Sequence, residues 1–112
     1  MVVAEFLTDK DSGSITMTLS GHAGAGEVGH DIVCASASIL AYTVAQTLQF
    51  MYGEGQLQKK PHIKLESGDC MITAKPKDEA YAEVLHTFFV AQVGYSLLAR
   101  NYPQFVDLKV SW

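Results

Sequence analysis

The chain has 112 residues, of which 48% are hydrophobic and 18% are charged, and its formal net charge is −4. This length has room for one domain around one core, and this hydrophobic content excludes an intrinsically disordered chain. With 8 Lys and Arg against 12 Asp and Glu, the chain is a poor match for nucleic acid, because phosphate binding needs a surplus of basic side chains. We therefore expect a single domain, residues 1–112, without nucleic acid as a direct partner.

The cysteine content indicates a reducing compartment. The chain contains two cysteines, Cys34 and Cys70, whereas a secreted domain of this size more often carries a denser set of disulfides. The first seven residues include Glu5 and no basic residue, unlike the basic start of a secretory signal peptide. We expect a cytoplasmic protein in which both thiols are reduced.

Two β-rich segments open the chain. Residues 2–8 and 14–20 are separated by a polar turn, DKDSG, which is typical of an antiparallel hairpin. In the second segment Ile15, Met17 and Leu19 alternate with hydroxyl-bearing residues. This strand should therefore have one buried face and one wetter face.

A glycine-rich segment and a long apolar helix follow. Residues 21–30 hold four glycines, which predicts weak intrinsic structure and mobility. Asp31 is predicted to cap a helix that runs to about Tyr52 and ends at Gly53. Residues 32–53 carry no charge and are long enough to span a bilayer, but their polar residues favour a buried helix in a soluble protein without a membrane partner. Since this helix is apolar on most of its circumference, a second copy of the chain could cover part of it.

The second half of the chain is expected to contain another hairpin, a second helix and a last strand. Residues 61–66 and 69–75 form another candidate hairpin, and a second helix is expected over about 79–100, where apolar residues recur at helical spacing. An alternating segment, 105–112, is expected to be the last strand. The order ββαββαβ predicts an α+β domain in which one sheet packs with two helices.

Residues able to carry chemistry gather around the predicted start of the first helix: His22, His30, Asp31 and Cys34. If Asp31 is the N-cap, Cys34 occupies the third helical position, where backbone N–H groups lack helical partners and the helix dipole is positive. A thiolate is favoured there, and the free N–H groups could stabilise an oxyanion. His22 could then accept the thiol proton as a general base. Ser38 follows Cys34 by one turn, so it lies on the same helix face and could contact the imidazole or a substrate.

Other interpretations of these residues stay open. A cysteine in an apolar helix is often a small buried hydrophobe, and His22 and His30 could have structural roles. His22, His30 and Cys34 could also ligate zinc, with Asp31 or Cys70 as a fourth ligand, although the spacing matches no common zinc motif. The glycines could cradle a phosphate at a helix N-terminus, but their loop contains neither Lys nor Arg.

The run GHAGAGEVGHDIVCASAS, residues 21–38, resembles the signature of the ribosomal-processing cysteine protease family, called Prp. In that pattern Gly-His-Ala opens a flexible loop and Asp-Ile-Val-Cys-Ala starts a helix. Outside this run the resemblance covers chain length and element order. Val28 departs from the pattern, since many members carry an aromatic residue there, and this departure concerns the packing of the loop and its substrate contacts.

The resemblance implies a catalytic pair, His22 and Cys34, and three supporting or substrate-binding positions, Gly21, Asp31 and Ser38. It implies an α+β homodimer that acts without a metal or an organic cofactor. It also implies the substrate, which is the short N-terminal extension of large-subunit ribosomal protein twenty-seven, removed during ribosome maturation.

Two other functions fit the same residues. A non-catalytic ribosome-assembly module could bind a peptide in the same groove and keep Cys34 as a packed residue. A thiol hydrolase acting on a small thioester could use the same Cys–His pair, because the chemistry of acyl transfer to sulfur is shared. A small phosphate- or RNA-binding domain is disfavoured by the acidic charge.

Overall fold

The computed structural model describes residues 1–22 and 30–112, and the side chains of these residues except His30 and Asp31. Within them the chain forms five strands and two α-helices in the order ββαββαβ, which confirms the predicted α+β architecture. The elements are β1 (Val2–Asp9), β2 (Ser14–Ser20), α1 (His30–Gly53), β3 (His62–Glu66), β4 (Asp69–Ala74), α2 (Tyr81–Asn101) and β5 (Val106–Ser111). A short 3-10 helix, η1 (Asp78–Ala80), leads into α2.

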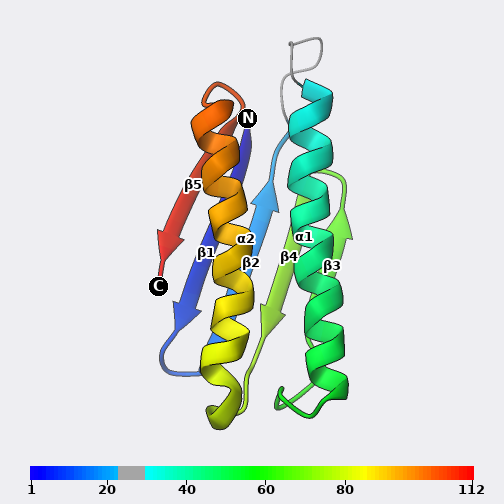
Figure 1. Ribbon diagram of the computed structural model, residues 1–112, viewed down its shortest axis with the longest axis vertical. Coiled ribbons are helices and arrows are strands. Elements are labelled where there is room, and N and C mark those ends of the chain that lie inside the picture. The colour runs from blue at the N-terminus through cyan, green and yellow to red at the C-terminus, as the bar shows by residue number, and fades with distance from the viewer. Residues whose placement is uncertain (23–29) are drawn as a thin grey trace.

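The strands form one mixed sheet in the order β3-β4-β2-β1-β5. Both predicted hairpins are confirmed, since β1 pairs with β2 and β3 pairs with β4 in antiparallel fashion. Strand β2 also pairs with β4, and β1 pairs with β5 in parallel. The two helices lie side by side across one face of this sheet, so the molecule has two layers (Figure 1).

The core fills the space between the sheet and the helices. Ile15, Met17 and Leu19 are buried, as their alternation in the sequence predicts. Helix α2 contributes its largest buried side chain, Tyr95, whose hydroxyl donates a 2.7 Å hydrogen bond to the carbonyl of Ala37 in α1. This bond satisfies the phenol inside the core and ties the two helices together.

The helices approach each other closely where α2 has a glycine. A Cβ at Gly94 would lie 2.8 and 2.9 Å from the two terminal methyl carbons of Leu40. Because real Cβ atoms do not come so close to carbon, the absence of a side chain at Gly94 is what allows Leu40 to fill the space between the helices.

The helix faces turned away from the sheet remain apolar. Residues of α1 and α2 exposed there include Ile32, Ile39, Phe50, Phe89, Val90, Val93 and Leu97. By length and composition both helices also suit a membrane span. However, each helix buries core residues against the sheet, so withdrawal into a bilayer would uncover the apolar face of the sheet.

The structure corrects the predicted start of the first helix. Helix α1 includes His30, so Asp31 lies inside the helix and is not its N-cap. An aspartate is favourable at either place, because the positive end of the helix dipole stabilises a carboxylate throughout the first turn. The sequence therefore indicated the right region but the wrong boundary residue.

Candidate active site

A cavity of about 160 Å³ lies at the end of the sheet where β2 stops and α1 starts. Four separate parts of the chain line it: the start of β1, the end of β2 with the two following residues, the first half of α1, and the β3–β4 turn. The lining residues are Val2, Leu19, Gly21, His22, Cys34, Ala37, Ser38, Tyr42, Glu66, Ser67, Gly68 and Cys70.

Four residues singled out from the sequence meet in this cavity: Gly21, His22, Cys34 and Ser38. His22 is exposed, whereas Cys34 and Ser38 are half-buried. Acyl transfer to sulfur requires a thiol and a base that lie close together, and these two side chains line the same small cavity. The fifth candidate, Asp31, has a side chain outside the described residues, as do His30 and the loop residues 23–29.

The backbone that carries His22 is held from both sides. Gly21 has a φ of +84°, and a Cβ there would overlap the carbonyl oxygen of Met1, so only glycine fits without strain. The Gly21 N–H donates a 3.0 Å hydrogen bond to the carbonyl of Gly68, and the nitrogen of Met1 donates a 2.7 Å bond to the carbonyl of His22. Gly21 therefore allows the chain to turn sharply where it leaves β2, next to His22.

Cys34 is positioned by the core packing of α1. Its neighbours Val33 and Ala37 are buried against the sheet, so the helix has little freedom to rotate. Because α1 includes His30, Cys34 lies beyond the third helical position that an N-cap at Asp31 predicts. The dipole effect fades beyond the first turn, so activation of this thiol would need a base close to it, and His22 lines the same cavity.

The second thiol, Cys70, has a different environment although it lines the same cavity. It is 7% exposed, and its Sγ donates to the carbonyl of Glu66 at 3.4 Å. Burial raises the pKa of the Cys70 thiol, which keeps it protonated. The prediction that Cys70 is a packed thiol is confirmed, and Cys34 is the better candidate for a nucleophile.

Sequence reasoning missed the contribution of the β3–β4 turn, where Ser67 and Gly68 form one wall of the cavity. The turn was visible in the sequence, but its place depends on the register that pairs Ser20 at the end of β2 with Asp69 at the start of β4. No local signal specifies that pairing.

Possible metal ligands are not grouped among the described side chains: no set of three or more His, Cys, Asp or Glu residues there could hold an ion. Of the zinc ligands considered from the sequence, His30 and Asp31 have side chains outside the described residues.

Comparisons with known proteins agree with this fold. The family model described as cysteine protease Prp matches residues 1–107. A crystal structure of the essential ribosomal processing protease Prp from S. aureus with a substrate peptide has a TM-score of 0.73 and 22% identity, and the match covers 99% of this chain and 100% of that one.

Two further crystal structures show the same fold. The S. aureus protease with a covalently linked product peptide gives a TM-score of 0.71 at 23% identity, again over 99% of this chain and 100% of the other. SMU.848 from Streptococcus mutans gives 0.70 at 29% identity, over 99% and 94% of the two chains. Among curated protein sequences, none matches this chain significantly. The family match extends through both helices and both hairpins, and the chain therefore belongs to the Prp family of cysteine proteases.

Proposed function

We propose that this cysteine protease removes the short N-terminal extension of large-subunit ribosomal protein twenty-seven, with Cys34 as the nucleophile and His22 as the base. The observation that carries the proposal is that these two side chains line one cavity. The S. aureus relative, which is a ribosomal processing protease seen with a substrate peptide, supports a ribosomal peptide as the substrate class.

In the proposed reaction the Cys34 thiol gives its proton to His22 and the sulfur attacks the scissile carbonyl carbon. Collapse of the tetrahedral intermediate breaks the C–N bond, and His22 returns the proton to the leaving amine. Water, activated by the same imidazole, then hydrolyses the thioester and releases the peptide acid. This chemistry uses only side chains of the chain and one water molecule.

The cavity lining suits an apolar substrate segment. Val2, Leu19, Ala37 and Tyr42 supply hydrophobic surface, while the Ser38 hydroxyl offers a donor and an acceptor for a peptide group. The family resemblance implies cleavage after a hydrophobic stretch that contains Phe, and such a stretch would place an apolar side chain against this surface.

Cleavage of a synthetic peptide that copies the extension, followed by mass spectrometry, tests the proposal. The wild type should cut one bond, and Cys34→Ala should cut none while still binding the peptide. Binding without cleavage by the wild type would favour the peptide-binding module instead. Hydrolysis of a small thioester with no peptide cleavage would favour the thiol hydrolase.

We also propose that the protein is a cytoplasmic homodimer joined through the outer faces of α1 and α2. The exposed apolar residues of these helices support this arrangement, as does a groove of about 280 Å³ between the helices whose lining includes Leu40 and Val90.

Sedimentation should show a dimer, and Val90→Lys should weaken it. Glu54→Lys, in the exposed loop after α1, is the control and should leave the dimer unchanged. A wild-type monomer at all concentrations would contradict the proposal.

A further inference from the structure

We propose that Gly68, in the β3–β4 turn, is a positioning residue that sets the orientation of the His22 imidazole. This inference rests on the proposed role of His22 as the base. It adds to the site a residue that lies far from the motif in sequence and that makes its contribution by having no side chain.

The imidazole lies directly against the backbone of Gly68. A Cβ at this position would lie 2.5 Å from Cε1 and 3.0 Å from Cδ2 of His22, and closer still to Nε2. All three atoms belong to the outer edge of the ring, so a side chain would meet the part of the imidazole that exchanges protons. No real Cβ approaches other atoms so closely, so the ring occupies space that any other residue at position 68 would fill.

Gly68 also holds the backbone that carries His22. Its carbonyl accepts the 3.0 Å hydrogen bond from the N–H of Gly21, the residue just before His22. One residue thus contacts both the backbone at the start of the His22 side chain and the outer edge of its ring. Since His22 is otherwise exposed, the backbone of Gly68 limits the rotamers that the ring can adopt beside the cavity shared with Cys34.

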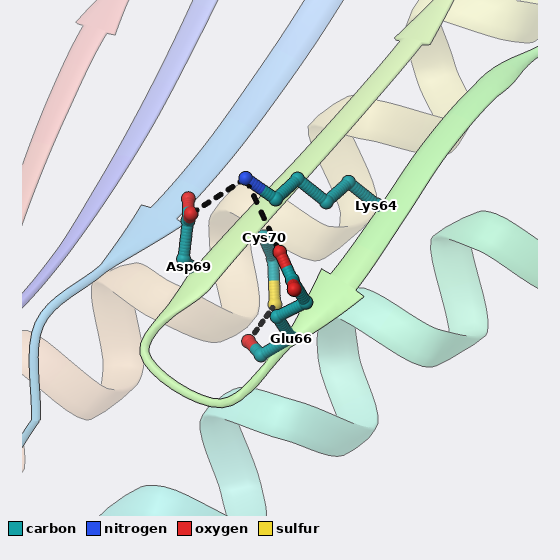
Figure 2. A network of polar contacts seen from close by, with 4 residues as sticks. All are labelled: Lys64, Glu66, Asp69 and Cys70. Atoms are coloured by element: carbon teal, nitrogen blue, oxygen red, sulfur yellow. Dashed lines mark hydrogen bonds and ion pairs between the residues drawn. The ribbon is translucent and has the colours of Figure 1, made fainter.

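The turn that carries Gly68 is itself braced, as Figure 2 shows. The Lys64 ammonium lies 2.7 Å from Oδ2 of Asp69 and 3.2 Å from Oε2 of Glu66, so it bridges the two strands on either side of the turn. On the same hairpin the Cys70 thiol donates to the Glu66 carbonyl. These ion pairs are exposed and add little to overall stability, but the pair with Asp69 joins the two strands that lead into and out of the turn.

Gly13 provides a matched control for Gly68. Both glycines are in hairpin turns with positive φ, +76° for Gly13 and +73° for Gly68, so an alanine costs similar backbone strain at either place. A Cβ at Gly13 would meet nothing within 4 Å, and its turn lies at the opposite end of the sheet from the cavity. The difference between the two variants therefore isolates the contact with His22.

The test compares Gly68→Ala and Gly13→Ala in the full chain. Gly68→Ala should lower kcat for the ribosomal peptide by about 10- to 100-fold with little change in KM, because misplacement of a catalytic group acts on the chemical step. It should also shift the pH dependence of Cys34 alkylation by iodoacetamide. Gly13→Ala should leave kcat, KM and the alkylation profile as in the wild type. Equal behaviour of the two variants would overturn the proposal.

A measurement on the wild type needs neither folding of the variant nor protease activity. The ring protons of His22 should show nuclear Overhauser effects to the α protons of Gly68, and their absence would overturn the proposal. If the wild type cleaves no peptide, the proposed function fails, whereas the position of the ring is still decided by this effect and by the alkylation profile.

Discussion

The two thiols that line the cavity differ in their burial. Cys34 is half-buried, whereas Cys70 is buried, bonded to a backbone carbonyl and kept protonated by its raised pKa. We expect iodoacetamide near neutral pH to modify Cys34 at least about tenfold faster than Cys70, since the thiolate is the reacting form. Mass spectrometry of the alkylated peptides measures both rates.

The matched variant for this experiment is Cys70→Ala. It should keep peptide cleavage and fast alkylation, because Cys34 is untouched. Loss of fast alkylation in Cys70→Ala, with Cys34 present and the protein folded, would contradict the assignment of Cys34 as the reactive thiol.

At the residue scale the sequence indicated which residues lie together better than it indicated what surrounds them. The pattern of residues pointed to His22, Cys34 and Ser38, the family resemblance added Gly21, and the structure finds all four around one cavity. The helix boundary at Asp31 was wrong, because capping and first-turn positions favour the same residue types. The wall formed by Gly68 could not be predicted, since it comes to His22 only through strand pairing.

Among the secondary-structure elements, the contact between α1 and α2 depends on Gly94. Gly94→Val should lower the free energy of unfolding by about 1–3 kcal/mol, because its methyl groups would overpack against Leu40. Urea unfolding measures this loss. Ala82→Val, at an exposed position of α2, gives the cost of a β-branched residue in a helix, which is at most about 0.7 kcal/mol. Equal losses in the two variants would show that the helices do not meet at Gly94.

The order and types of the elements could be predicted from periodicity and turn residues, but their arrangement could not. Alternation in β2 identified its buried face, yet it contained no information on whether β4 or β5 lies beside it. In α2 the apolar residues predicted at helical spacing include Phe88, which is in the core, and Phe89, which is exposed. Hydrophobicity alone does not distinguish a face that meets the sheet from one that meets a partner.

On the scale of the whole molecule, three groups make stability depend on alkaline pH. Burial raises the pKa of Tyr95 above its ordinary value of 10.0 and that of Cys70 above 9.0. The hydrogen bond to Asp69, with the contact to Glu66, raises the pKa of Lys64 above 10.5. At a pH below its ordinary pKa, each of these three groups is protonated in both the folded and the unfolded chain. At a pH above that value, the group loses its proton first in the unfolded chain. The free energy of unfolding should therefore begin to fall near pH 9 and should fall more steeply above about pH 10, where Tyr95 and then Lys64 lose their protons in the unfolded chain.

Urea midpoints across this pH range measure the fall. Tyr95→Phe should reduce the pH dependence, and it should also cost about 1 kcal/mol at neutral pH through loss of the bond to Ala37. Tyr52→Phe, which removes an exposed hydroxyl, is the control and should follow the wild type. An unchanged slope in Tyr95→Phe would rule out the buried phenol as a cause.

The parallel pairing of β1 with β5 has a consequence for the order in which parts of the enzyme fold. Val2 lines the cavity, and its N–H donates a 2.7 Å bond to the carbonyl of Phe105, next to β5. Strand β1 pairs with its sequence neighbour β2 on one side, but on the other side it pairs with β5, which is distant in sequence, and such distant contacts form slowly. The cavity wall at Val2 is therefore expected to be completed late in folding, after the local β1–β2 hairpin has formed.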